Sequence, residues 1–188
     1  MNFLDLVLQR QSVRKYLPKA VEPQKLQRCL EAARLAPSAS NSQPWSFIVV
    51  DDPVLKDQVA RHTYDDVLSF NKFVPSAPVL VVFVLEKPKV ITRIGAVIKK
   101  LEYPLIDIGI AAEHFCLQAT EEGLGTCMLG WFNAKPVKKL LRIPASKTIG
   151  LIISAGYPPE EYKLRDKSRK KYEEVVFFNA YKANSRPG

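Results

Sequence analysis

The pattern of hydrophobic positions predicts alternating helices and strands. Apolar side chains recur every three or four residues near the N-terminus and again after Pro23, a residue that suits the start of a helix. This spacing predicts helices over residues 4–8, 26–33, 53–61, 105–122 and 135–141. Short apolar runs rich in β-branched residues predict buried strands over 46–50, 78–85, 126–129 and 148–155. The fold class is therefore α/β or α+β, with helices dominant.

Two apolar segments are candidates for burial in the core or against another subunit. The helix expected over 105–122 is apolar on nearly every face, which is typical of a helix buried in a core or a subunit interface. The run over 175–178 predicts a lone apolar strand after a polar and basic stretch. A lone strand of this kind often pairs with a distant partner, including another subunit.

Composition narrows the class of protein. The 188 residues, 47% hydrophobic and 25% charged, fit one globular domain and exclude a disordered or collagen-like chain. An odd set of three cysteines without paired spacing fits free thiols in a reducing compartment. The first ten residues lack the features of a secretory signal, so we expect a cytoplasmic protein. The net charge of +9 calls for an anionic partner to be considered.

Most catalytic motifs are missing. His62 and His114 are the only histidines, and neither has a second ligand at metal-binding spacing, so we expect no metal site. There is no Gly-x-Ser-x-Gly elbow and no phosphate loop of the Walker type. The glycines at 123 and 125 lack the third glycine of a dinucleotide fingerprint and are read as a helix stop.

Two basic segments could bind an anion. Arg10, Ser12 and Arg14 would lie on one side of an extended strand, where two guanidinium forks and a hydroxyl suit a phosphate. A solvated basic turn is the alternative. The second basic segment, 163–171, is the densest and raises the possibility of nucleic acid, although acidic residues interrupt it and no nucleic-acid-binding motif accompanies it.

Two further segments could receive a flat ligand. Residues 36–45 form a loop of small polar residues stiffened by Pro37 and Pro44, which would let a ligand approach the main chain closely. Gly130, at the expected end of a strand, permits a similar approach to a backbone N–H. An ordinary connection and an ordinary turn are the alternatives.

Together the four segments resemble the FMN-dependent nitroreductase family, over about residues 3–176. The markers are Arg10-x-Ser12-x-Arg14-x-Tyr16, Ala36-Pro37-Ser38-x-x-Asn41-x-Gln43-Pro44-Trp45, Gly123-Leu124-Gly125-Thr126, Leu129-Gly130-Trp131 and Lys167-x-Arg169-Lys170 followed by Glu173-Glu174-Val175-Val176. The resemblance implies an α+β sandwich with a central mixed or antiparallel sheet flanked by helices. It further implies one domain, 1–188, in an intertwined homodimer, with FMN at each subunit interface. The tail from about 160 to 188 would extend over the partner subunit.

The resemblance also implies which residues contact FMN. Arg10 and Ser12 would hold the phosphate and ribityl end, and Arg14 would lie near the pyrimidine edge, where a cation stabilises negative charge on the ring. The remaining implied contacts are Gln11; Pro37, Ser38 and Ala39 from the other subunit; Asn71; Leu129, Gly130 and Trp131 along the ring; and Lys167 and Arg169 at the phosphate.

The chemistry that the resemblance implies belongs to the cofactor. NADPH or NADH would pass a hydride to FMN and leave, and a nitroaromatic, quinone or similar electrophile would then be reduced in a ping-pong cycle. No catalytic side chain is implied, and Cys127 is read as a packing residue. The segment 86–103 would form a lid that governs acceptor choice.

Other functions stay open from the residues. Specialised flavin chemistry on the same fold would include dehalogenation, enoyl-type reduction or flavin fragmentation. A non-enzymatic protein that binds nucleic acid or another anion, or a flavin-binding regulator without turnover, would also suit the charge. The resemblance itself implies neither a nucleic-acid nor a membrane partner.

Overall fold

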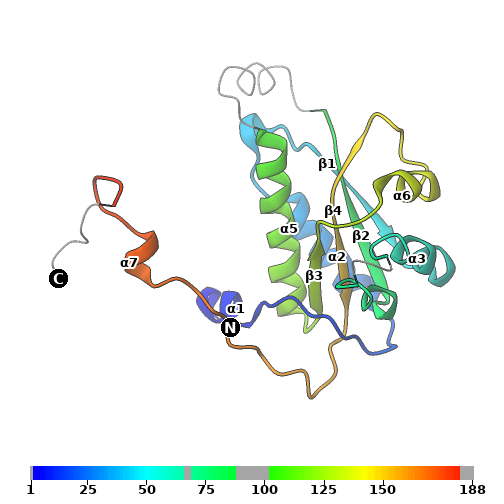
Figure 1. The fold of residues 1–188 in the computed structure, drawn as a ribbon, viewed down its shortest axis with the longest axis horizontal. Helices are drawn as coiled ribbons and strands as arrows, with labels where there is room; N and C mark the ends of the chain where they lie inside the picture. The colour runs from blue at the N-terminus through cyan, green and yellow to red at the C-terminus, as the bar shows by residue number, and fades with distance from the viewer. Residues whose placement is uncertain (1, 66–68, 88–101, 183–188) are drawn as a thin grey trace.

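A four-stranded antiparallel sheet forms the centre of the computed structural model, which describes residues 2–65, 69–87 and 102–182 (Figure 1). The strand order is β1-β2-β4-β3. The strands are β1 (Trp45–Val50), β2 (Val79–Leu85), β3 (Gly125–Leu129) and β4 (Thr148–Gly156). The four strands expected from the sequence are thus confirmed, and the sheet is antiparallel rather than mixed.

Helices precede, connect and follow the strands. The helices are α1 (Phe3–Gln9), α2 (Pro23–Arg34), α3 (Pro53–Ala60), α5 (Tyr103–Glu121), α6 (Ala134–Leu140) and α7 (Tyr172–Val175), with short 3-10 helices η1 (Ala39–Asn41) and η2 (Val74–Ser76). Asp52 caps α3 through a bond from Leu55 N to its side chain at 2.8 Å, and Pro53 occupies the first turn, where its missing N–H costs nothing. All five expected helices are confirmed. In the described part of the chain, no helix has both the length and the apolar character needed to cross a membrane.

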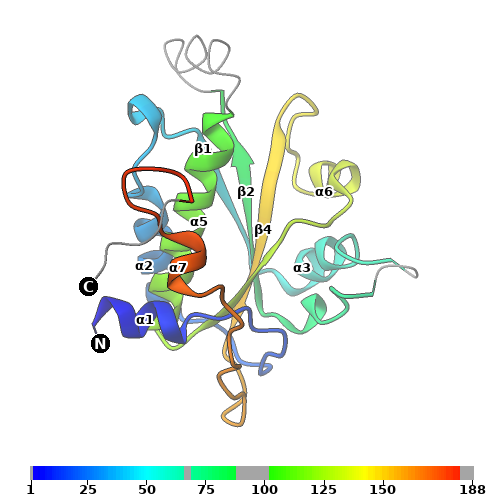
Figure 2. The ribbon, with the colours of Figure 1, turned by 60° about the vertical axis from the view of Figure 1, so that its left-hand side comes forward.

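Strand β2 is apolar at every position, which fits its burial on both faces of the sheet. Val79, Val81 and Phe83 pack with α2 and α5, whereas Leu80 and Val82 pack on the opposite face, in a cluster that also contains residues of α3 and α6. Figure 2 shows the two groups of helices on either side of the sheet. Alternate side chains of β2 therefore belong to two separate cores, as expected for a strand covered on both faces.

Helix α5 is the long helix that covers one face. Its buried residues include Ile108, Ala112 and Phe115, and it packs against α2. Helix α5 also lies close to β4 at Gly150, where a Cβ would come within 3.1 Å of the Ile108 side chain. The first turns of α5 expose Leu105 and Ile106, so this helix is buried on one side and presents apolar groups on another.

The strand expected over 175–178 is wrong. Val175 ends the short helix α7, and residues 176–178 form no strand. The local reason is a cap: the backbone N–H of Lys171 donates to the Glu174 carboxylate at 2.6 Å, which favours a helical turn there. Figure 1 shows α7 and the adjoining tail extending away from the sheet.

Most of the expected lid lies outside the described residues, which omit 88–101. Its described flanks are anchored in the fold. Glu86 accepts a hydrogen bond from the Ser46 hydroxyl at 2.9 Å and is paired with Lys147, and Tyr103 begins α5. The carboxyl group of Glu86 has a lowered pKa because of the Lys147 ammonium.

Candidate functional site

The segment that carries Arg10, Ser12 and Arg14 runs beside the start of β3. The backbone N–H of Val13 donates to Thr126 O at 2.8 Å, and Ser12 forms an isolated parallel bridge with Thr126. Gly125 is required at this crossing, because a Cβ on it would lie 2.6 Å from the Val13 side chain. The sheet thus fixes the backbone from which the basic side chains project.

The tail returns to this segment and closes a small cavity. The cavity has a volume of about 280 Å³, and we call it the basic cavity; it is lined by Arg10, Gln11, Ser12, Arg14, Arg165, Asp166, Lys167, Ser168 and Arg169. Arg165 donates from its backbone N–H to the Gln11 amide oxygen at 3.1 Å and from its guanidinium to Ser12 O at 2.5 Å. Residues more than 150 positions apart therefore meet at one site.

Lys167 links the tail to the end of α1. Its ammonium donates to Val7 O at 3.2 Å and to Leu8 O. The last carbonyls of a helix lack partners within the helix and carry partial negative charge, so a cation is favourable there. The same bonds hold the ammonium at the rim of the basic cavity.

The basic cavity concentrates positive charge. Five cationic side chains and one carboxylate line it. Burial, together with the nearby Arg10 and Arg169, lowers the pKa of Lys167. Arg10 Nε is buried and lies 3.2 Å from a Glu113 carboxylate oxygen, without the alignment of a hydrogen bond. Cations that repel one another in this way favour the binding of an anion between them.

The end of β3 forms a second part of the candidate site. Leu129 is buried, whereas a Cβ on Gly130 would meet no atom within 4 Å. Trp131 is 51% exposed and stacks edge-to-face with Phe70, with ring centroids 6.4 Å apart. The backbone at Gly130 is therefore open to close approach, beside an exposed aromatic pair.

Asn71 fixes the backbone at this edge. Its side chain is 6% exposed, and its amide nitrogen donates to Thr63 O at 3.0 Å and to Trp131 O at 3.2 Å. Both amide hydrogens are thus used within the chain. Asn71 holds the turn after β3 in place.

The third part is the loop between α2 and β1. Ser40, Asn41 and Gln43 have φ angles of 53°, 49° and 48°, and we call residues 37–43 the strained loop. Left-handed backbone costs roughly 1 kcal/mol for a residue with a side chain, so this loop needs external support. Its internal bonds include that from Gln43 N to the Ser38 hydroxyl, at 2.9 Å.

A buried carboxyl group on α5 supports the strained loop. The backbone N–H of Ala39 donates to Asp107 Oδ1 at 3.0 Å. Asp107 is 3% exposed, and its other oxygen, Oδ2, is buried without a hydrogen-bond partner. Burial raises the pKa of this carboxyl, and the Ala39 N–H opposes that shift. Leaving a buried polar atom unpaired costs roughly 1–3 kcal/mol.

The basic cavity and the strained loop lie on different sides of α5. Glu113, beside Arg10, and Asp107, beside Ala39, are six residues apart, which corresponds to about 9 Å along a helix axis and roughly 240° around it. Both views place the 39–41 segment near the first turns of α5 and α1 near its far end (Figures 1 and 2). Within one chain the loop therefore does not line the basic cavity, whereas Arg10, Gln11, Ser12, Arg14, Lys167 and Arg169 all do.

Comparison with known proteins identifies the family. A protein-family model described as the nitroreductase family matches residues 7–157. This chain belongs to the nitroreductase family. An oxygen-insensitive NADPH nitroreductase of Helicobacter acinonychis is 32% identical to it over 179 residues, covering 78% of this chain and 81% of that protein. An iodotyrosine deiodinase of Thermotoga neapolitana is 27% identical, covering 83% of this chain and 88% of that protein.

Solved structures of the nitroreductase family share the fold. The structure of an FMN-dependent nitroreductase from Clostridium difficile superposes with a TM-score of 0.78 at 30% identity, covering 95% of this chain and all of that one (100%). The antiparallel sheet with helices on both faces is thus the nitroreductase α+β fold. As a member of this family, the protein is an oxidoreductase enzyme.

Sequence reasoning missed two residues at the basic cavity of this nitroreductase. Arg165 lines the cavity and anchors the tail, and its signal was the basic residue at every second position from 163 to 169. Glu113 approaches Arg10 from α5. No local signal marks Glu113, because its partner is far away in the sequence.

The three cysteines of the nitroreductase are free and buried, in agreement with the expectation of free thiols and with the interpretation of Cys127 as a packing residue. Burial raises the thiol pKa of Cys29 and of Cys116 to about 12. Burial also raises the pKa of Cys127, although nearby arginines oppose it. Neutral thiols of this kind are poor nucleophiles.

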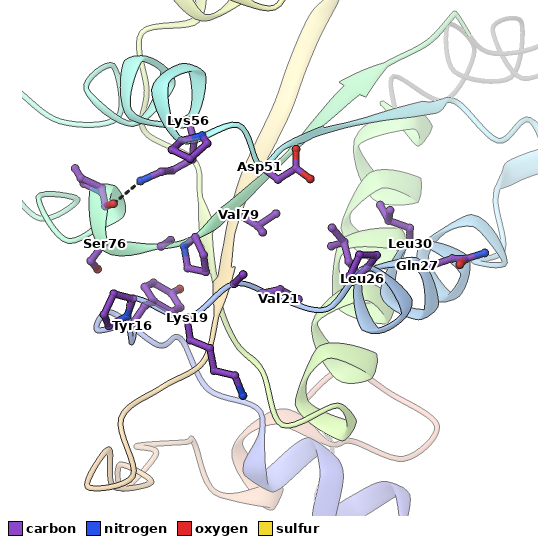
Figure 3. Close-up of a pocket in the computed structure, with 17 residues that line it drawn as sticks. Tyr16, Lys19, Val21, Leu26, Gln27, Leu30, Asp51, Lys56, Ser76 and Val79 are labelled. Atoms are coloured by element: carbon purple, nitrogen blue, oxygen red, sulfur yellow. Dashed lines mark hydrogen bonds between the residues drawn. The ribbon is translucent and has the colours of Figure 1, made fainter.

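A larger cavity of about 750 Å³ lies between α2, the preceding segment and η2 (Figure 3). None of the residues expected at the cofactor lines it. The ammonium group of Lys56 donates to Pro75 O at 2.6 Å, as the dashed line in Figure 3 marks, and is therefore already satisfied. The convergence of charge, and not the volume of a cavity, distinguishes the candidate site.

Proposed function

We propose that this nitroreductase-family protein is an FMN-dependent enzyme that uses NADPH or NADH to reduce nitroaromatic, quinone or similar electrophilic compounds. The observation that carries the proposal is the basic cavity, where five cations from two distant segments converge. The names of the Helicobacter and Clostridium relatives, an NADPH nitroreductase and an FMN-dependent nitroreductase, support the donor and the cofactor.

The basic cavity fits the phosphate of FMN. Burial and, after it, the repulsion by Arg10 and Arg169 lower the pKa of Lys167. A dianionic phosphate would relieve this repulsion, and it would offer an acceptor near the buried Nε of Arg10. Arg10, Ser12, Lys167 and Arg169 would hold the phosphate and the ribityl end, and Arg165 joins them. Gln11 would act by fixing Arg165 through its amide.

The edge after β3 fits the ring system. Leu129, Gly130 and Trp131 would line the ring, with the open backbone of Gly130 against it. Asn71 would contribute through its hold on the Trp131 carbonyl. Arg14 would supply positive charge near the pyrimidine edge. When bound, FMN supplies the redox chemistry, in which two electrons and a proton pass from NAD(P)H to the acceptor in successive half-reactions.

The protein works as an intertwined homodimer of single-domain subunits in this proposal. Pro37, Ser38 and Ala39 complete the ring side of the partner's site. Within the tail that begins at about residue 160, residues 165–169 stay on their own chain at the basic cavity, and the part beyond them extends over the partner. Apolar side chains exposed on α1 and α5 support the proposal: Phe3, Leu4 and Leu8 on α1, and Leu105 and Ile106 on α5.

An absorption spectrum of the purified protein tests the proposed function. We expect flavin bands that bleach when NADPH or NADH is added under argon and that return when a nitroaromatic or a quinone is supplied. The donor that bleaches the bands faster is the preferred one. A colourless protein that takes up no FMN would overturn the proposal, and salt-dependent binding of other anions would then be examined.

Reductive dehalogenation is the second candidate, because the Thermotoga relative is an iodotyrosine deiodinase. In that reaction an aryl iodide and NAD(P)H would give the arene, iodide and NAD(P)⁺. Iodide release from iodotyrosine, compared with reduction of a nitroarene at equal donor concentration, separates the two acceptors.

A further inference from the structure

The strained loop contains an unusual concentration of unfavourable backbone. Ser40, Asn41 and Gln43 all carry side chains, and all lie in the left-handed region. Residues held in such conformations persist only where their surroundings hold them, and they gather at functional sites. The support for this loop therefore matters for whatever the loop does.

Asp107 supplies part of that support from α5. Its Oδ1 atom accepts the Ala39 N–H at 3.0 Å, which ties the loop to a long and well-packed helix. Ala39 lies next to the start of the left-handed stretch. The bond thus fixes the end of the Pro37–Ala39 segment that precedes Ser40.

A carboxyl group at position 107 lowers the stability of the fold. Asp107 is 3% exposed beside the apolar core residues Ile108 and Ala111, and Oδ2 has no partner. Burial raises the pKa of the carboxyl, which records the same cost. A buried carboxyl that leaves one oxygen unpaired costs the fold free energy that an apolar side chain of similar size would not cost. A carboxyl at this place is therefore better explained by the position it gives to the loop.

We infer that Asp107 is a positioning residue, which holds the Pro37–Ala39 segment in the shape that forms the ring-side wall of the partner's FMN site. This inference rests on the proposed function. Asp107 acts through the Ala39 N–H and does not touch the cofactor. It acts on the ring end, whereas Arg10 acts on the phosphate end.

Three variants of the full-length protein test the inference: Asp107→Leu, Asp107→Ala and Asp107→Asn. Asn retains an oxygen that can accept the Ala39 N–H, whereas Leu and Ala do not. We expect Leu and Ala to weaken the binding of both FMN and riboflavin about tenfold, or about 1.4 kcal/mol. Asn should bind both flavins within about twofold of the wild type. Thermal unfolding of the apoprotein should be unchanged or shifted upward for Asp107→Leu.

Riboflavin separates this role from the phosphate site, because it lacks the phosphate. Arg10→Ala is the matched comparison and should weaken FMN while leaving riboflavin unchanged. Equal flavin affinities in the wild type, Asp107→Leu and Asp107→Ala would overturn the inference. A loss confined to FMN, or an Asp107→Asn protein as defective as Asp107→Leu, would overturn it as well.

The proposed function fails differently. A wild-type protein that binds neither FMN nor riboflavin would overturn the function and the inference together. A wild type that binds both, beside variants that bind equally well, would overturn the inference alone. If Asp107→Leu does not fold, Asp107→Ala and Asp107→Asn still carry the comparison, because Ala removes volume and Asn preserves the size and shape of the aspartate side chain.

Discussion

The basic cavity and the strained loop lie on two sides of α5 and differ in the interactions that hold them. The basic cavity gathers five cations, and bonds to backbone carbonyls hold three of them, Arg165, Lys167 and Arg169. The strained loop has no charge, and a buried carboxyl ties its backbone to α5. Residues of one chain line the cavity, and the residues of the loop are not among them. One part of the site thus depends on charge, and the other depends on conformation.

Removing the tail should have the largest effect on the basic cavity. Ending the chain after Asp166 deletes Lys167 and Arg169 and the segment beyond them. We expect at least 100-fold weaker FMN binding, because two charged contacts of roughly 1.5–3 kcal/mol each are lost. The proposed dimer should weaken as well. Flavin content after desalting and sedimentation velocity check both, and a yellow, dimeric truncated protein would contradict the assignment.

Single arginine changes come next in size. Arg10→Ala and Arg14→Ala should each weaken FMN binding about 10- to 100-fold, since each removes one charged contact. Arg34→Ala is the matched control, because Arg34 is exposed on α2 and pairs with Glu31 away from the cavity. Fluorescence titration with FMN measures all three. Wild-type affinity in both Arg10→Ala and Arg14→Ala would remove the phosphate site from this cavity.

The lowered pKa of Lys167 predicts a pH effect on the charged side only. The charged ammonium binds phosphate, so FMN affinity should fall as pH rises through the pKa of Lys167, below the ordinary lysine value of 10.5. Lys167→Arg should remove this alkaline decline, because arginine stays charged. Titrations between about pH 7.5 and 10.5 check it. An identical decline for riboflavin would show that a different group is responsible.

The smallest effect is expected for Gly130→Ala, which tests the edge after β3 where the ring would lie. A Cβ there meets no atom within 4 Å of the chain, so the unfolding temperature of the apoprotein should be unchanged. A ring lying against this backbone would be displaced, at a cost of about 1 kcal/mol, or roughly fivefold in affinity for FMN and riboflavin alike. Unchanged flavin affinity would place the ring elsewhere.

The sequence predicted the four strands and five of the six α-helices in the described part of the chain, because periodicity is a local property. Strand β2 is apolar at every position and was readily predicted as a core strand. The run over 175–178 was equally apolar but forms no strand: Glu174 caps a helical turn ahead of it, and among the described residues the run does not join the sheet. Apolar character predicts burial only where another element is available to cover it.

The candidate site was predicted as far as its residues carry recognisable chemistry. The arginines at 10 and 14 and the basic residues at 167 and 169 stand out by charge, and the structure brings them together. Asp107 and Glu113 could not be found in this way, because both lie within the pattern of one long helix. Their importance depends on Ala39 and Arg10, which only the folded chain brings close.

The contact of Lys167 with the last carbonyls of α1 has a consequence for the lifetime of the protein in a cell. It joins a helix near one end of the chain to a segment near the other. The residues that follow the helix, from Arg10 onward, and the segment at 165–169 both line the basic cavity. A bound phosphate group would therefore hold both segments together. The fraction of molecules in which they are held would rise with the concentration of the cofactor. Proteases that start at loose chain ends would remove molecules without cofactor and spare the loaded ones.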